Sequence, residues 1–215
     1  MLVVKNKIKT KEEDGSLKFL LESSGVDNLL EAEVFVDKEN QPYKVKVEMP
    51  IFRDKNSVKK EGIFTIVRLK GITQIIVDES DLKFNQNNYK QEFIKIRDRF
   101  GLSDELAVGV IWKSKVANKI SIKPVIWVRN TDSYYYETSC ASGTIATALS
   151  EIKNENNSDS IKKYDIYQPS GSKIVASIKK YNDSFSDAYI EGGVDVIAEG
   201  KTYILKNKIN NNINK

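Results

Sequence analysis

The sequence contains one cysteine, Cys140, in a run of small residues at 138–144 that leads directly into Ile-Ala-Thr-Ala-Leu at 145–149. This pattern predicts a strand that ends in a turn, followed by a helix that begins close to Cys140. A thiol in such a turn faces the unpaired N–H groups and the positive end of the helix, which favour its thiolate form. The same N–H groups can bind a carboxylate. The spacing therefore predicts a reactive thiol beside an anion-binding turn.

The residue types that the sequence lacks narrow the chemistry further. None of the 215 residues is a histidine, which excludes a Ser-His-Asp or Cys-His pair within this chain and argues against a zinc site. Acid–base chemistry then falls to the thiol, to carboxylates, or to lysine and tyrosine side chains. No Gly-rich phosphate loop follows a predicted strand and no cluster of ligating residues occurs, so we expect no cofactor and no metal.

Charge, hydropathy and cysteine content indicate the compartment of the protein and the classes of partner that it lacks. The formal net charge of +4 comes from lysines spread along the sequence, without a basic block, so we expect no nucleic-acid partner. No segment approaches the roughly 20 apolar residues that span a bilayer, and residues 1–5 start no signal peptide. A single cysteine excludes an internal disulfide framework and suits a reducing compartment. We expect a cytoplasmic protein without membrane contact.

The predicted elements are mostly strands, with two helices. Residues 91–100 carry apolar side chains on one face, whereas residues 142–152 are apolar on nearly every face and should be buried inside a curled sheet. A polar loop is expected at 154–159, and an Asn- and Lys-rich tail at 207–215. Alternating polar and apolar residues predict strands at 17–21, 33–36, 43–47, 62–67, 75–77, 108–112, 120–128, 173–178, 188–191 and 194–198.

Four segments occur in an order typical of one enzyme superfamily. Residues 137–144, Glu-Thr-Ser-Cys-Ala-Ser-Gly-Thr, resemble its catalytic-cysteine motif E-x-S-C-G-S-G-T, and residues 69–77 resemble its G-N-P-H segment in the variant G-I-T-H. Residues 167–174 and 190–200 resemble the Gly-rich hairpin and the closing strand pair that follow. The chain thus resembles the diaminopimelate epimerase-like amino-acid racemases and epimerases, which need no pyridoxal phosphate, and especially the histidine-racemase type.

The resemblance implies an α+β fold with a mostly antiparallel, barrel-like lobe around a buried central helix, plus an incomplete second lobe. It divides the chain into an incomplete N-terminal lobe at 1–60, a complete catalytic lobe with Cys140 at 61–200, and a stretch at 201–215. That last stretch should form a strand that returns to the N-terminal lobe, and then a flexible tail. The family's first catalytic cysteine, in a Gly-Asn-Gly-x-x-Cys turn, is expected just before Met1, so this sequence lacks it.

The resemblance also implies a mechanism. Racemisation removes the α-proton from one face of an amino acid and delivers a proton to the opposite face, and the family uses one cysteine for each. Cys140 is then one acid/base group. The remaining predicted site residues are the carboxylate-binding amides of Ala141, Ser142 and Gly143, the ammonium acceptor Glu137, and the further substrate contacts Asn130, Gln74 and Thr73. Ala141 replaces the family's Gly, which is harmless only if its φ is negative, and Gln74 replaces a histidine.

Each of these residues also has an ordinary structural interpretation. A lone cysteine is often a small buried apolar residue. Glu137 could be a strand-end or helix-entry charge, and Asn130 could belong to a turn. The three tyrosines at 134–136 suit strand packing, and Trp112 and Trp127 suit the core.

Three functions therefore stay open. The first is the large subunit of a split amino-acid racemase, in which a small partner subunit supplies the second catalytic cysteine through an obligate interface. The second is a paralogue that binds or senses an amino acid without racemising it. The third is an isomerase that uses an Asp or Glu as its base, although no second acid lies at a matching turn.

Overall fold

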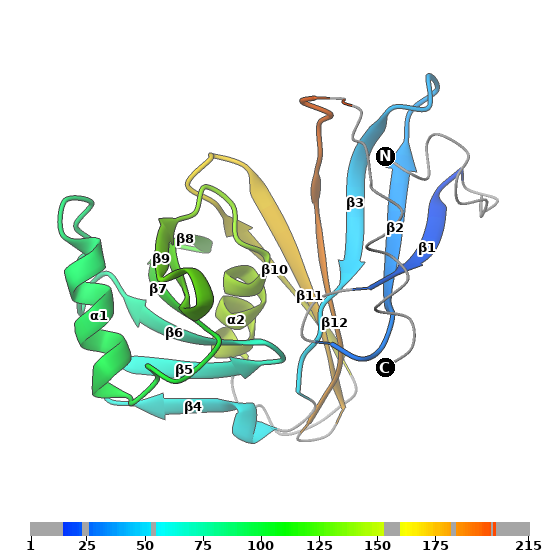
Figure 1. The fold of residues 1–215 in the computed structure, drawn as a ribbon. Helices are drawn as coiled ribbons and strands as arrows, with labels where there is room; N and C mark the ends of the chain where they lie inside the picture. The colour runs from blue at the N-terminus through cyan, green and yellow to red at the C-terminus, as the bar shows by residue number, and fades with distance from the viewer. Residues whose placement is uncertain are drawn as a thin grey trace, which may run out of the picture.

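The computed structural model describes residues 15–22, 26–52, 55–152, 160–181, 184–198 and 200. This part of the chain forms one mixed sheet of twelve strands with two α-helices, an α+β fold dominated by strands (Figure 1). The strands are β1 (Leu17–Leu21), β2 (Leu30–Val36), β3 (Pro42–Glu48), β4 (Val58–Glu61), β5 (Phe64–Leu69), β6 (Ile72–Asp78), β7 (Ala107–Val116), β8 (Lys119–Val128), β9 (Ser133–Tyr136), β10 (Ser160–Tyr167), β11 (Lys173–Tyr181) and β12 (Ser184–Gly193). The helices are α1 (Tyr89–Arg99), α2 (Ala141–Glu151) and the short 3-10 helices η1 (Lys55–Ser57) and η2 (Arg129–Thr131).

The sheet runs in the order β1-β2-β3-β12-β11-β10-β8-β7-β6-β5-β4, and β9 pairs with β8 off this path. Its pairs are antiparallel except β6 with β7 and β8 with β10, which are parallel. Parallel neighbours need a long crossover, which is usually a helix. The two α-helices lie in these two connections, α1 between β6 and β7 and α2 between β8 and β10.

Helix α2 forms the centre of the larger core. It contacts β5, β6, β7, β8, β10, β11 and β12, so the sheet curls around it (Figure 1). Residues 143–149 of the helix are all buried. The burial predicted for this helix is therefore confirmed, and its cause is the absence of any polar face that could meet water.

Helix α1 covers the opposite face of the sheet. Its buried residues Phe93 and Ile96 pack in a second core with Val108, Val110 and Trp112 of β7. Strands β6 and β7 are consequently buried on both faces, which explains their continuous apolar sequences. Strands β1 to β3 extend the same sheet through the pairing of β3 with β12 (Figure 1).

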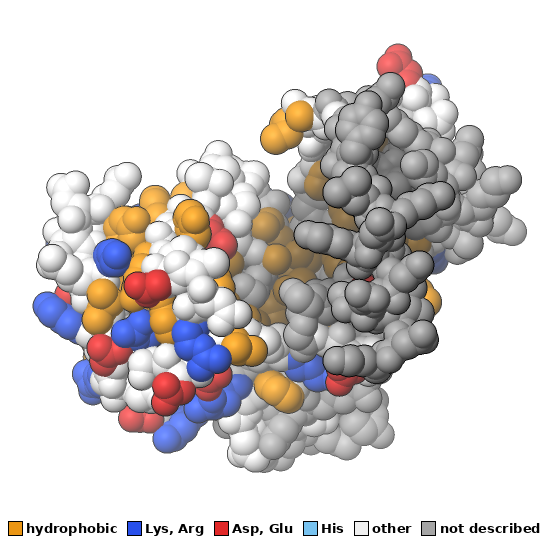
Figure 2. All heavy atoms as spheres, viewed as in Figure 1, with side chains coloured by type: hydrophobic (Ala, Val, Ile, Leu, Met, Phe, Trp, Pro, Cys, Tyr) orange, Lys and Arg blue, Asp and Glu red, His pale blue; other side chains and the backbone are white. Residues whose placement is uncertain are grey.

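The surface seen in Figure 2 carries mixed charges. Lysine and arginine side chains alternate with aspartate and glutamate over the part that holds α1 and β4, without a block of one sign. This agrees with the even spread of lysines in the sequence. Within the described residues, no helix is long and apolar enough to cross a membrane.

Several predicted elements differ from the structure. The strand predicted at 194–198 is wrong: after Val194 donates to the Tyr43 carbonyl at 3.2 Å, the chain leaves the sheet and Ile197 is 96% exposed, so no apolar face is buried. Strands β4 and β10 were not predicted because lysines and other charged residues interrupt their apolar pattern. The loop predicted at 154–159 and the stretch at 201–215 lie outside the described residues.

The end of α2 is fixed to β7 by a charged cluster. Glu151 accepts hydrogen bonds from Lys113 Nζ and Lys115 Nζ, both at 2.6 Å, and its side chain is only 11% exposed. Burial alone would raise the pKa of the Glu151 carboxyl, but the hydrogen bonds from the two lysines outweigh burial and hold that pKa below its usual range. The stabilisation is therefore present above the usual pKa of about 4.3 and is lost as the pH falls through the lower folded-state pKa.

We predict that Glu151→Gln lowers the free energy of unfolding by about 1–3 kcal/mol at pH 7, because two ammonium groups lose their charged acceptor. The measurement is urea denaturation at pH 7 and at a series of lower pH values, where the difference should shrink as the pH falls from the usual pKa of about 4.3 towards the lowered pKa of the wild-type carboxyl. Glu61→Gln is the matched control, because Glu61 pairs with Lys59 at an exposed site and should change stability by less than about 1 kcal/mol. Equal losses in the two variants would contradict the prediction.

Candidate functional site

Cys140 lies between β9 and α2, where it is the N-cap residue of the helix. Its backbone is extended, with φ −133° and ψ 109°, and its side chain turns back over the first turn of α2. The Gly143 N–H donates to the Cys140 Sγ at 3.3 Å. A Cβ on Gly143 would lie 3.0 Å from that sulfur and 2.9 Å from Ile111 Cδ1, so only glycine lets the sulfur approach this amide closely.

The buried side chain of Gln168 holds the Cys140 backbone in place. Its Oε1 accepts from the Cys140 N–H at 3.0 Å, and its Nε2 donates to Thr144 Oγ1 at 3.0 Å. Thr144 Oγ1 in turn donates to the Cys140 carbonyl at 2.6 Å. Sequence reasoning missed Gln168 as a site residue. The available signal was a glutamine placed directly between a strand and the turn Pro169-Ser170-Gly171.

A second contact joins the same turn to the residues before Cys140. The Ser170 N–H donates to the Thr138 carbonyl at 2.9 Å, and the Ser139 and Ser170 hydroxyls lie 3.1 Å apart. The turn itself closes through Gly171, whose φ of +85° favours glycine. The hairpin between β10 and β11 therefore holds the loop that carries the thiol. The sequence predicts this hairpin as a Gly-rich segment, but not its contact with that loop.

The electrostatic environment opposes the thiolate. Burial, together with the nearby Glu137 carboxylate, raises the pKa of the Cys140 thiol to about 12. Hydrogen bonds from Ser142 and from the Gly143 N–H act in the opposite direction but do not reverse the shift. The expected preference for the thiolate is therefore wrong for this state. The helix N-terminus does face the sulfur, but at 2% exposure desolvation outweighs it, and the group is a neutral thiol at pH 7.

The amides next to Cys140 divide into two kinds. The Gly143 N–H is occupied by the sulfur, whereas the Ala141 and Ser142 N–H groups have no acceptor in the described part of the chain. Both residues are half-buried. Ala141 is helical and its φ is not positive, so an alanine at the family's glycine position causes no strain. Two adjacent free amides at a helix N-terminus are suited to a carboxylate.

The structure brings Glu137 and Gln74 to this site in different ways. Glu137 is half-buried, its N–H donates to the Pro124 carbonyl at 2.9 Å, and its carboxylate lies close enough to the sulfur to raise the thiol pKa. Gln74 is fully buried on β6, and its Nε2 donates to Ser142 Oγ at 2.9 Å. Gln74 therefore contacts Ser142 and has no exposed surface for a ligand.

Thr73 and Asn130, which were expected to contact the substrate, do not lie beside Cys140. Successive side chains of a strand point to opposite faces, so Thr73 lies on the face of β6 that also carries Ile75 and Val77, in the core beside α1. Asn130 is exposed in η2, at the end of β9 where Ser133 pairs with Val128. Cys140 follows the opposite end of β9. Asn130 therefore belongs to a turn, which is the structural alternative to its predicted role as a substrate contact.

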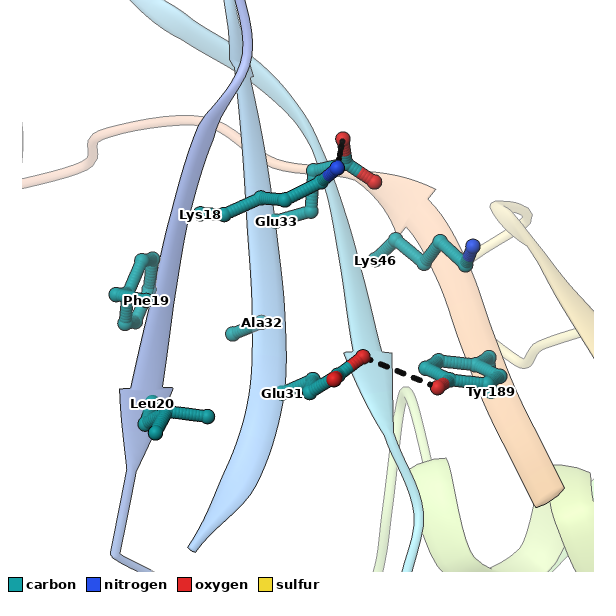
Figure 3. Close-up of a pocket in the computed structure, with 8 residues that line it drawn as sticks. All are labelled: Lys18, Phe19, Leu20, Glu31, Ala32, Glu33, Lys46 and Tyr189. Carbon is teal, nitrogen blue, oxygen red and sulfur yellow. Dashed lines mark hydrogen bonds and ion pairs between the residues drawn. The ribbon is translucent and has the colours of Figure 1, made fainter. Parts of the chain in front are cut away.

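A separate concave region of about 650 Å³ lies on the face of β1, β2, β3 and β12 (Figure 3). Its polar groups are engaged with one another: Tyr189 donates to Glu31 at 3.2 Å, the Lys18 ammonium lies 3.9 Å from Glu33, and Lys46 lies 4.7 Å above the Tyr189 ring. This region is the curved face of a twisted sheet with paired charges. Across the described ranges, no group of three or more His, Cys, Asp or Glu residues could hold a metal ion.

The chain is similar in sequence to known proteins. A family model described as the N-terminal domain of histidine racemase matches residues 1–203. A histidine racemase of Fusobacterium nucleatum subsp. nucleatum is 30% identical over 185 residues, and that of a second strain is 29% identical over 182 residues. A histidine racemase of Staphylococcus aureus is 31% identical over 83 residues, which is 39% of this chain and 29% of that protein.

The two Fusobacterium matches cover 85% and 84% of this chain, and the chain spans 64% of the length of each of these relatives. The family model covers nearly the whole sequence and includes every residue of the Cys140 site. The chain therefore belongs to the histidine racemase family.

Proposed function

We propose that this chain carries one of the two proton-transfer groups of an amino-acid racemase of the histidine-racemase type that works without pyridoxal phosphate. The observation that carries the proposal is the position of its only cysteine, Cys140, at the N-cap of α2 beside the free amides of Ala141 and Ser142. A racemase needs an acid/base group within reach of the α-carbon and a fixed anchor for the carboxylate. These two parts lie side by side here.

The ligand in this proposal is an α-amino acid. Its carboxylate accepts from the Ala141 and Ser142 N–H groups, and its ammonium group donates to the Glu137 carboxylate. The α-carbon lies between these two anchors and next to the Cys140 sulfur. The relatives at about 30% identity are named histidine racemases, which supports histidine as the substrate.

Because the thiol is protonated in this structure, Cys140 acts as the proton donor in one direction of the racemisation. A base on the opposite face of the substrate removes the α-proton, and the Cys140 S–H delivers its proton to the carbanion, which leaves a thiolate on Sγ. The Gly143 N–H and the Ser142 hydroxyl then stabilise that thiolate. A bound ammonium group also neutralises Glu137, which removes one of the two causes of the raised pKa of the thiol.

The opposing group comes from polypeptide outside this sequence, because the 215 residues contain one cysteine and no histidine. We assign it to a second cysteine, carried by a small partner subunit, on a two-lobed diaminopimelate epimerase-like scaffold. In this arrangement residues 1–60 belong to the lobe that the partner completes, and residues 61–200 form the lobe with Cys140. The comparison supports a missing part, since the relatives are longer than this chain.

A second function fits one specific observation. With one thiol, held protonated by its surroundings, the chain could bind an amino acid without exchanging its α-proton. The amides of Ala141 and Ser142 and the Glu137 carboxylate would serve this function as well. The two functions differ in whether the α-carbon exchanges hydrogen with solvent.

We predict that L-histidine in D₂O gains deuterium at its α-carbon when this chain is mixed with the segment of the Fusobacterium relative that the chain does not match. Cys140→Ala should reduce the formation of D-histidine, followed by chiral chromatography, at least about 100-fold, because the group that delivers the proton to the opposite face is lost. Asn130→Ala is the matched control and should stay within about twofold, since Asn130 lies at the far end of β9. The measurement is proton NMR of the α-position.

Three results of this experiment have distinct meanings. Full racemisation by the chain alone would refute the need for a second polypeptide. Binding of L-histidine by the mixture without any exchange would favour the binding function. Conversion of L-histidine to D-histidine that survives Cys140→Ala would remove Cys140 from the mechanism.

The protonation state of Cys140 gives a further prediction. Iodoacetamide reacts with the thiolate, and a thiol with a pKa near 12 should be alkylated about tenfold faster per pH unit from pH 7 to pH 10, without a plateau. Since Cys140 is the only cysteine, mass spectrometry of the intact chain measures this rate directly. A plateau beginning near pH 7 or 8 would show a stabilised thiolate and contradict this account.

A further inference from the structure

The side chain of Gln74 occupies an unusual space between β6 and α2. Gln74 is fully buried and lies opposite Gly109 of β7. A Cβ on residue 109 would lie 1.9 Å from Gln74 Oε1, so the amide fills the volume that any other residue at 109 would need. From there the Gln74 Nε2 reaches Ser142 Oγ at 2.9 Å. The glycine on β7 thus gives Gln74 access to the helix that carries the site.

The direction of this hydrogen bond determines what Ser142 can do. An amide nitrogen only donates, so the Ser142 oxygen accepts from Gln74 and keeps its own proton for another acceptor. The Cys140 Sγ lies 3.6 Å from Ser142 Oγ, within the range for a hydrogen bond to sulfur. With the Gly143 N–H at 3.3 Å, the sulfur then faces two donors. Glu137 is the titratable group that also faces this sulfur, and its negative charge raises the pKa of the thiol.

The other end of the Gln74 amide shows that the residue is not placed for stability alone. Its Oε1 is buried and has no hydrogen-bond partner in the described part of the chain. An unpaired buried acceptor is unfavourable, and an apolar side chain of similar length would avoid it. The residue nevertheless keeps its Nε2 on Ser142, which indicates a role in the site.

We propose that Gln74 is a positioning residue that orients the Ser142 hydroxyl as a donor to the Cys140 sulfur. It acts through Ser142 and does not contact the substrate, in contrast to its expected role as a substrate contact. The inference deepens the proposed function and rests on it, because it concerns how easily Cys140 gives up its proton during turnover.

The test is the alkylation rate of Cys140 by iodoacetamide at pH 9 in Gln74→Met, which keeps the length of the side chain and removes its donor. One lost hydrogen bond should lower the thiolate fraction about tenfold, and the higher nucleophilicity of the more basic thiolate offsets part of this. We expect alkylation about threefold slower. A mere loss of packing would open the site and make alkylation faster, so the sign of the change separates the two roles.

Ser142→Ala provides the matched variant, because it removes the hydroxyl at a half-buried position. It should slow alkylation about as much as Gln74→Met, and the double variant should be no slower than Ser142→Ala alone. Faster alkylation in either single variant, or additive losses in the double variant, would overturn the proposal. If Gln74→Met fails to fold by circular dichroism, the rate of Ser142→Ala alone still decides whether the hydroxyl assists the sulfur. The assay needs no turnover, so its failure is distinguishable from failure of the proposed racemase activity.

Discussion

The structure depends on the enclosure of one helix that has no polar face. Because residues 143–149 of α2 are all buried, the strands that contact the helix must curl around it. The apolar composition of α2 thus leaves the start of the helix, at Ala141 and Ser142, half-buried while residues 143–149 are enclosed. Cys140 lies at that place, and the hydrogen bonds of Gln168 and Ser170 keep the loop there.

Enclosure also sets the chemistry of the thiol. The same burial that fixes Cys140 removes the water that a thiolate needs, and this effect outweighs the partial charge at the helix N-terminus. The site in this state is therefore prepared to donate a proton. It becomes better suited to accept one when a cation neutralises Glu137, because that carboxylate contributes to the raised pKa of the thiol. Two donors, the Gly143 N–H and the Ser142 hydroxyl, are already in position.

The sequence allowed prediction of the α+β class, of both helices and of the Cys140 turn, because these features follow from local periodicity and small-residue patterns. It did not allow prediction of β4 and β10, whose pairing partners compensate for charged sequences. Thr73 and Gln74 show the same limit at the site: they are neighbours in sequence, but strand alternation sends only Gln74 toward α2. Gln168 and Gly109 matter through contacts across the sheet that no local pattern contains.

The central claim is that the start of α2 holds the carboxylate of an amino acid beside Cys140. The most direct measurement is a titration of ¹⁵N-labelled protein with L-histidine, followed by the amide resonances of Ala141 and Ser142. Histamine, which has the same ring and amine but no carboxylate, is the control ligand. The account predicts that both amides shift with L-histidine and stay unchanged with histamine. Equal shifts with the two ligands, or no shift with either, would contradict it.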